Sequence, residues 1–294
     1  MHLIKVRALL EKAYLLKATN SIRVIPDISN GLKAFDPGDV KKHSIFLRSQ
    51  IKGKHMRLMI CFIMLVSTVS FAGGNDSIQS FNKAKKNLER KVYFDHRETL
   101  YCAAEFDDKK NVFSPEGFTT TKHVKRAKRI EWEHVVPAEN FGRTFREWRD
   151  GHPQCVSKNG KTFKGRNCAS KMNLEYRFMQ ADMYNLFPAI GAVNAMRSNY
   201  NFVPSADAKS SFGSCNVKIT DRKVEPPVNA RGRIARTYLY MQDAYKRYNM
   251  SKQQAKLMAA WDKTYPVSEW ECKRASRIAG IQGNENRIMS ERCK

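Results

Sequence analysis

Apolar residues recur at helical spacing over several parts of the chain. The stretch from Ser77 to Tyr93 begins with a residue suited to an N-cap and has apolar side chains three or four positions apart. Residues 230–248 and 251–265 have the same amphipathic pattern, and a serine N-cap opens the second of them. Residues 173–199 are also helical in pattern, although they include Pro188, which breaks or kinks a helix.

Two other stretches are typical of strands. Residues 99–103 form a short β-compatible run, and residues 129–136 alternate as a half-buried strand does. The alternation divides the second stretch into one face with Ile130, Trp132 and His134 and another with Glu131, Glu133 and Val135. Residues 142–170 are rich in Gly, Lys, Asn and Arg, which indicates a surface loop held by cysteines.

These elements predict a mixed α+β fold with more helix than strand. The chain has no internal repeat and no low-complexity tract, so we expect a single domain. Its hydrophobic content of 42% is ample for a packed core, which argues against general disorder.

The longest apolar run, residues 58–72, has the features of a secretory signal peptide. Basic residues precede it, a small-residue cleavage site ends it, and it is shorter than the roughly 20 residues of a membrane span. A methionine stands directly before the last basic residue. We therefore interpret residues 56–72 as the signal peptide and residues 73–294 as the exported domain. Residues 1–55 are then either an upstream start-site artefact or the short cytoplasmic tail of an uncleaved signal anchor.

The chain is strongly basic. Its 53 Lys and Arg outnumber its 28 Asp and Glu, which gives a formal charge of +25 and a pI near 9.9. Beyond residue 57 there remain 41 basic and 24 acidic residues, a net charge of +17, so the basic character belongs to the exported domain. Such an excess favours a polyanionic partner, either nucleic acid or an anionic membrane surface.

Six cysteines lie beyond the apolar run, and an even number in an exported chain predicts three disulfides. Cys155 with Cys168, and Cys272 with Cys293, are plausible local bridges because they are close in sequence. A zinc site is the alternative, but no C-x-x-C pair supports it.

The run Glu131-Trp132-Glu133-His134 places two carboxylates and an imidazole at the end of a predicted strand. A carboxylate can hold a divalent cation while an imidazole takes a proton from water, as hydrolysis of a phosphodiester requires. Because Mg²⁺ prefers oxygen ligands, Glu133 is the candidate carboxylate and an asparagine the candidate amide. The predicted helix offers three asparagines: Asn185, Asn194 and Asn199. From spacing alone, a strand glutamate is more often solvated than metal-bound, and a helix asparagine is more often a surface or capping residue.

With the sequence around it, this run resembles the active-site segment of the bacterial endonuclease I family, exported nucleases of the ββα-metal superfamily. The resemblance begins at residues 129–138 and continues in order across nearly all of residues 77–294. The other matching segments are 165–168, 181–186, 188–194, 197–199, 226–227, 230–238, 265–272 and 281–284.

The resemblance implies a role for each of four residues. Glu133 and Asn194 match the two protein ligands of the metal, His134 the general base, and Arg166 the arginine that holds the cleaved phosphate. It also implies a ββα-metal unit, formed by the strand that ends at His134 and the helix that bears Asn194. The expected cation is Mg²⁺, with Mn²⁺ or Ca²⁺ as possible substitutes. Glu131 receives no role.

The resemblance further implies a monomeric periplasmic or secreted enzyme without stable membrane association. Members of the family cut DNA, and often RNA, with little sequence preference, which suits a protein that grips phosphates. Arg231, Arg233 and Arg236 are candidates for backbone contacts, or else form a solvated basic face. The main alternative is an exported non-catalytic DNA-binding protein, which leaves the joint presence of the four site residues unexplained.

The chain departs from the family pattern at four places. Tyr184 stands where many relatives have histidine, and the loop between Trp148 and Lys171 is longer. The motif Gly165-Arg166-Asn167-Cys168 is one residue shorter than the Gly-Arg-x-x-Cys of some relatives. The chain also has fewer cysteines before residue 130, so we expect one disulfide of those relatives to be absent.

Overall fold

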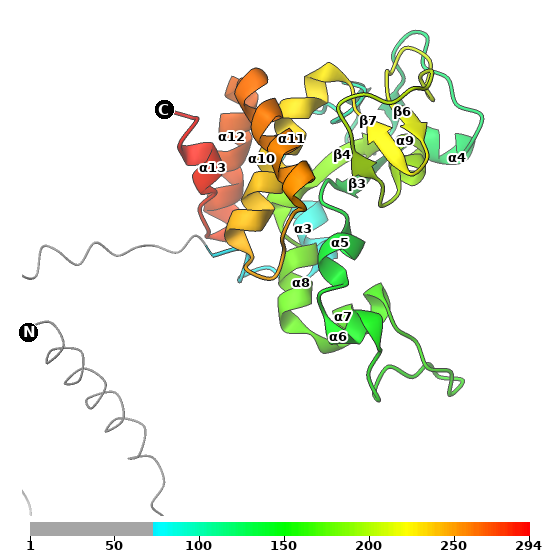
Figure 1. The fold of residues 1–294 in the computed structure, drawn as a ribbon, viewed down its shortest axis with the longest axis vertical. Helices are drawn as coiled ribbons and strands as arrows, with labels where there is room; N and C mark the ends of the chain where they lie inside the picture. The colour runs from blue at the N-terminus through cyan, green and yellow to red at the C-terminus, as the bar shows by residue number, and fades with distance from the viewer. Residues whose placement is uncertain (1–72) are drawn as a thin grey trace, which may run out of the picture. The chain divides into compact units, whose positions relative to one another are not determined.

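Residues 73–294 are described in the computed structural model, and they form an α+β fold in which helices predominate (Figure 1). The predicted mixed, helix-rich class is confirmed. The segments interpreted as a start-site artefact or tail, 1–55, and as a signal peptide, 56–72, lie outside the described residues. Between residues 73 and 294, no helix is both long and apolar enough to cross a bilayer.

An antiparallel strand pair lies at the centre of the fold. β3 (Ile130–His134) pairs with β4 (Leu186–Ile190), so that His134 opposes Leu186 and Ile130 opposes Ile190. All of β4 is buried, and so is most of β3. The predicted strand ending at His134 is therefore confirmed.

The single kinked helix predicted over residues 173–199 is wrong. The segment contains α8 (Leu174–Gln180), the 3₁₀ turn η3 (Met183–Asn185), β4 and α9 (Gly191–Arg197). The five residues of β4 are uniformly apolar, and such a short run suits a buried strand as well as a helix. Pro188 is tolerated there because a two-stranded sheet leaves one side of β4 without a strand partner.

β4 runs directly into α9, and α9 contacts both strands. Gly191, the first residue of α9, allows this close approach. A Cβ at this position would lie 2.5 Å from the carbonyl oxygen of Arg126 and 2.9 Å from Oε1 of Glu131. β3, β4 and α9 thus form a strand–strand–helix unit, with Asn194 in the middle of the helix.

Helices of the C-terminal third pack beside this unit (Figure 1): α10 (Val228–Ala244), α11 (Lys252–Thr264), α12 (Glu269–Gln282) and α13 (Arg287–Ser290). The two amphipathic helices predicted here are confirmed as α10 and α11, and Ser251 caps the latter. No periodicity noted above predicts α12, although its capping box of Ser268 and Glu271 is readable in the sequence.

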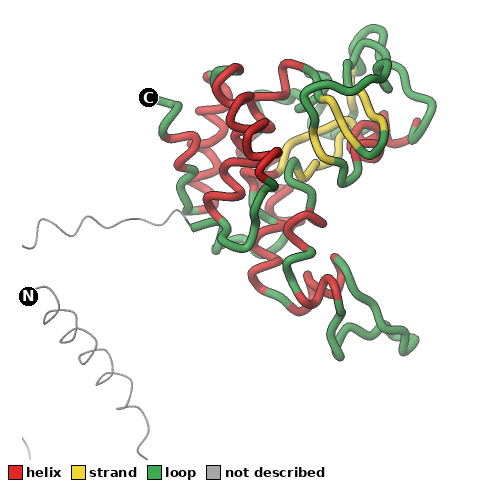
Figure 2. The backbone as a smooth tube through the Cα atoms, viewed as in Figure 1, coloured by secondary structure: helices red, strands yellow, loops and turns green. Residues whose placement is uncertain are grey.

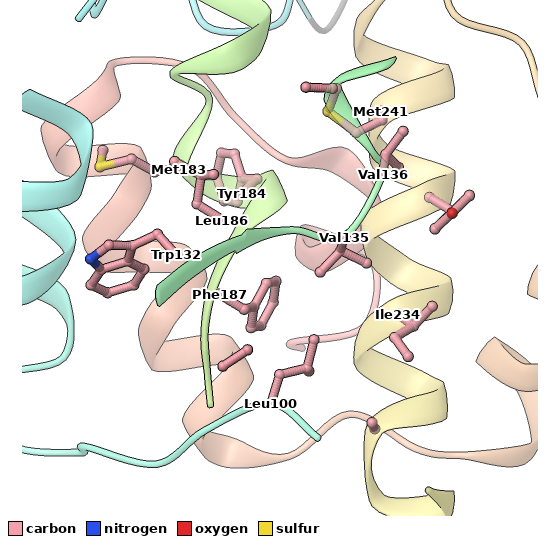
Figure 3. Close-up of a cluster of buried hydrophobic side chains, with 14 of the residues drawn as sticks. Leu100, Trp132, Val135, Val136, Met183, Tyr184, Leu186, Phe187, Ile234 and Met241 are labelled. Carbon is pink, nitrogen blue, oxygen red and sulfur yellow. The ribbon is translucent and has the colours of Figure 1, made fainter. Parts of the chain in front are cut away.

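The end of β3 is held in the core that Figure 3 shows. Val135 and Val136, which follow β3, lie beside α10 and its Ile234 and Met241, and all four side chains are fully buried. Burial of such a side chain stabilises the fold by about 1.5–3 kcal/mol. The strand end that carries the candidate chemistry is therefore firmly anchored.

The N-terminal part of the domain contains α3 (Phe81–Asn87), the π-helical turn η2 (Leu88–Val92), β1 (Glu105–Phe106) and β2 (Val112–Phe113). The helix predicted over 77–93 is confirmed for most of its length. The strand predicted over 99–103 is wrong. These residues form a turn closed by a hydrogen bond from the Thr99 N–H to the Ala104 carbonyl, and Ala103 is left-handed with φ 48°.

The remaining elements are short: α4 (Val124–Ala127), α5 (Ala138–Gly142), α6 (Arg146–Arg149), α7 (Arg166–Met172), and a sheet of β5 (Asn201–Phe202), β6 (Lys218–Thr220) and β7 (Lys223–Glu225) in the order β5-β7-β6. Figure 2 shows the stretch between α6 and α7 as an irregular loop. The surface loop predicted over 142–170 is confirmed for this stretch, whereas both of its ends are helical.

Three disulfides join the six cysteines, as predicted: Cys102–Cys215, Cys155–Cys168 and Cys272–Cys293. The two local bridges were readable from sequence proximity, and the third connects cysteines 113 positions apart. The alternative zinc site is excluded, because a disulfide sulfur carries no thiolate to bind the metal.

Candidate active site

A pocket of about 620 Å³ opens where β3 and α9 meet α3 and the start of α7. All four predicted site residues line this pocket: Glu133, His134, Arg166 and Asn194. Glu131 lines it as well. The fold therefore brings Asn194 beside β3, although it lies far from the residues of that strand in the sequence.

His134 is buried at the end of β3, and its Nε2 lies 2.8 Å from the carbonyl oxygen of Gln180. A carbonyl oxygen only accepts, so Nε2 must carry the proton and Nδ1 is left with the free lone pair. Burial and then the nearby charge of Arg166 lower the pKa of His134 to about 3. The imidazole is therefore neutral at physiological pH, as a general base must be.

Glu133 is buried and held by two partners on one of its oxygens. Oε1 accepts from the Tyr101 hydroxyl at 2.9 Å and from Nη1 of Arg197 at 3.0 Å. Burial raises the pKa of Glu133, and the Arg197 guanidinium opposes that rise. Within residues 73–294 no hydrogen bond is made to Oε2, so this oxygen is available to a cation in the pocket.

Arg197 is fully buried and joins the two adjacent site residues. Besides Glu133, it donates to the carbonyl oxygens of His134 at 2.8 Å and Val135 at 2.5 Å. Neither this arginine nor Tyr101 has a role predicted from the sequence. Because neither forms part of a local motif with Glu133, only the folded structure reveals them.

Asn194 is oriented by a carboxylate. Its Nδ2 donates to Oε2 of Glu131 at 2.7 Å, and since a carboxylate only accepts, the amide oxygen of Asn194 must point elsewhere. The other two candidate asparagines differ. Asn185 uses both ends of its amide on the backbone of Val136, and Asn199 donates to Glu139 at 2.6 Å.

The oxygens that the pocket offers suit a hard divalent cation. Oε2 of Glu133 and the amide oxygen of Asn194 are a carboxylate and an amide ligand, and Mg²⁺ is typically bound by one or two carboxylates while it keeps several waters. These residues therefore fit the metal that the family resemblance implies.

Four basic side chains line the pocket from different elements: Lys85, Lys110, Arg126 and Arg166. Two of them are paired with carboxylates, Lys110 with Glu89 and Arg126 with Glu131. Burial and the neighbouring Lys110 lower the pKa of Lys85. Arg166 is exposed at the first position of α7, close enough to His134 to lower the pKa of the imidazole. Such a lining attracts a polyanion.

The basic trio on α10 does not offer the free guanidinium groups considered from the sequence. Arg231 pairs with Glu225, Arg233 with Glu98, and Arg236 with Glu271. Arg236 is buried and also pairs with Asp262 at 3.3 Å. The helical position of these residues was readable in the sequence, but their distant acidic partners were not.

Known proteins resemble this chain over most of its length. The family model described as Endonuclease I matches residues 77–292. The chain is similar to an extracellular deoxyribonuclease of Aeromonas hydrophila, with 39% identity over 244 residues, 81% of this chain and 98% of that protein. It is 37% identical to a periplasmic deoxyribonuclease of the same organism, over 81% of this chain and 95% of that protein. Endonuclease-1 of Buchnera aphidicola subsp. Baizongia pistaciae is 36% identical, over 81% and 96% respectively. The chain therefore belongs to the endonuclease I family.

Proposed function

We propose that this protein is an exported, Mg²⁺-dependent endonuclease that hydrolyses phosphodiester bonds of DNA, and also of RNA, with little sequence preference. One observation carries the proposal: His134, with Nε2 bound to a carbonyl and Nδ1 free, lines the same pocket as the Glu133 carboxylate and the Asn194 amide. The names of the relatives, which are deoxyribonucleases and an endonuclease, support the same reaction class.

His134 starts the reaction. Its Nδ1 takes a proton from a water molecule, which attacks the phosphorus in line with the departing 3′ oxygen, so the products carry 5′-phosphates. The hydrogen bond from Nε2 to Gln180 keeps the ring in the tautomer that this step needs. Phe81 packs against the imidazole, with the two ring centroids 5.0 Å apart.

Glu133 and Asn194 would hold the cation. Bound there, Mg²⁺ would supply positive charge to the pentacovalent transition state and the leaving oxygen; Mn²⁺ or Ca²⁺ are possible substitutes. The buried clamp of Tyr101 and Arg197 fixes the Glu133 carboxylate before any metal arrives. Arg166 holds a non-bridging oxygen of the cleaved phosphate. Phosphates are common to all sequences, so these contacts do not select bases.

The protein acts outside the cytoplasm as a monomer, in the periplasm or the medium. Its relatives are named extracellular or periplasmic, and three disulfides suit an oxidising compartment. The basic excess of residues 73–294 suits DNA as the partner rather than a membrane.

Incubation of the purified exported protein with plasmid DNA, with and without EDTA, tests this function. We expect nicked and then linear plasmid in Mg²⁺, and no cleavage after chelation. A non-catalytic DNA-binding protein, the main alternative, would retard the plasmid in a gel and leave it intact under both conditions. That result would overturn the proposal.

A further inference from the structure

Glu131 belongs to the pocket but has no part in the mechanism above. Its two oxygens are both occupied: Oε1 accepts from Nε of Arg126 at 2.7 Å, and Oε2 accepts from Nη2 of Arg126 at 2.5 Å. Oε2 also accepts from Nδ2 of Asn194 at 2.7 Å. Three donors on two oxygens leave this carboxylate poorly suited to bind a cation directly.

The guanidinium of Arg126 fixes the plane of the Glu131 carboxylate. A two-pronged Arg–carboxylate pair has a defined geometry, because both N–H groups of the fork must align with both oxygens. The start of α9 is packed against this pair. A Cβ on Gly191 would come 2.9 Å from Oε1 of Glu131 and 2.5 Å from the backbone of Arg126. The position of the carboxylate is therefore set from two sides.

An asparagine amide has two ends of similar shape and opposite chemistry. A cation needs the oxygen, and an amide turned by half a rotation would present N–H groups to it instead. Of the two ends of the Asn194 amide, only Nδ2 can donate to the charged carboxylate of Glu131. The contact with Glu131 therefore permits one of the two orientations of the amide. The same contact leaves the oxygen of Asn194 on the side away from Glu131.

We propose that Glu131 is a positioning residue, which, held by Arg126, turns the amide oxygen of Asn194 toward the cation site. This inference rests on the proposed function, since it assumes that Asn194 is a metal ligand. Partners that hydrogen-bond to metal ligands typically change metal affinity by about 10–100-fold when they are removed.

Binding of Mn²⁺ to the metal-free protein without DNA, followed by the loss of the free-ion EPR signal, tests the inference without any activity measurement. Glu131→Ala removes the acceptor, and we expect Mn²⁺ affinity to fall by at least about tenfold. Glu131→Gln keeps an oxygen that accepts from Asn194, so its affinity should stay within about threefold of the wild type.

Glu139→Ala is the matched control, because Glu139 accepts from Nδ2 of Asn199 in the same pocket and not from Asn194. We expect its Mn²⁺ affinity to be unchanged. Thermal unfolding of each variant identifies any that fails to fold, and Glu131→Gln then still tests the inference.

Two results would overturn the positioning role. Wild-type Mn²⁺ affinity in Glu131→Ala would show that the Asn194 amide is oriented without Glu131. Equal, large losses in Glu131→Gln and Glu131→Ala would show that the carboxylate itself is a ligand. Glu133→Ala and Asn194→Ala separate this inference from the proposed function. If neither lowers Mn²⁺ affinity, the proposed metal site is wrong; if both do and Glu131→Ala does not, only the positioning role fails.

Discussion

The pocket has two sides that are built in different ways. On one side, Glu133 and His134 end a buried strand, and hydrogen bonds from Tyr101 and Arg197 fix their positions. On the other side, Arg166 is exposed at the start of α7 and follows an irregular loop. The residues proposed to move a proton and to bind a metal are thus held by the core, whereas the arginine proposed to hold the phosphate lies in a surface segment.

This difference has an energetic consequence. Substitution of a residue on the buried side should affect both stability and catalysis. Its charged or polar partner would remain buried without an ion pair or hydrogen bond. Substitution of the exposed Arg166 should instead affect catalysis alone. Substitutions on the two sides should therefore have different effects on stability and on cleavage.

Arg197→Ala tests the buried side. The substitution leaves the Glu133 carboxylate in the core without the Arg197 guanidinium. Breaking a buried ion pair in this way costs about 3–5 kcal/mol. Urea unfolding measures the loss. Arg287→Ala is the control, since it breaks an exposed pair with Asp243 and should cost at most about 1 kcal/mol. Similar small losses in both variants would contradict the role of Arg197 as a buried clamp.

Arg166→Ala tests the exposed side. Removal of a cation from the developing phosphate charge should lower kcat by about 10²–10³-fold, with no change in the free energy of unfolding. Arg146, an exposed arginine on the neighbouring α6, provides the control, and its alanine variant should keep wild-type kcat. Unchanged kcat in Arg166→Ala would remove this residue from the site.

The disulfide Cys155–Cys168 holds the segment that carries Arg166. The pair of substitutions Cys155→Ser and Cys168→Ser opens a short loop and should cost up to about 3 kcal/mol in the chain-entropy account. Cleavage should also weaken, because α7 begins with Arg166 and contains Cys168. Opening Cys272–Cys293 should cost similar stability and leave cleavage by the folded protein unchanged. If opening either disulfide slowed cleavage equally, the expected dependence of Arg166 on the Cys155–Cys168 disulfide would be wrong.

The smallest effect concerns pH and the buried side. His134 has a pKa of about 3 in the folded protein and about 6.5 when unfolded, so the unfolded chain binds the extra proton between these values. Stability is therefore complete above about pH 6.5 and falls as the pH drops, by about 1.4 kcal/mol near pH 5.5. Urea unfolding of wild type and His134→Gln at both pH values measures the difference. A parallel pH dependence in the two proteins would rule out His134 as its source.

Local patterns were enough to predict part of the fold. Alternation over residues 129–136 revealed β3, which the structure ends two residues earlier at His134. Helical periodicity revealed α10 and α11, and a serine cap marked the start of α11. β4 was missed because five consecutive apolar residues have no period that distinguishes a buried strand from a helix. Its strand character depends on pairing with β3, which is more than fifty positions earlier.

Local sequence patterns also revealed only part of the candidate active site. Glu133, His134 and Asn194 were predicted through the family resemblance, and the fold places them in one pocket. Alternation did put Glu131 and Glu133 on the same face, but only the structure shows that Glu131 reaches Asn194. Arg197 was missed because arginine is normally exposed, and the burial that makes it a clamp arises from tertiary packing.

In the proposed mechanism His134 is the general base. Cleavage of plasmid DNA by His134→Ala in Mg²⁺ tests this role most directly. We predict a loss of about 10²–10⁴-fold in cleavage rate, because that is the usual contribution of a general base. DNA binding in a gel-shift assay at the same salt concentration should persist, since the basic lining of the pocket is intact. Normal turnover by the folded variant would contradict the assignment of His134 and the mechanism built on it.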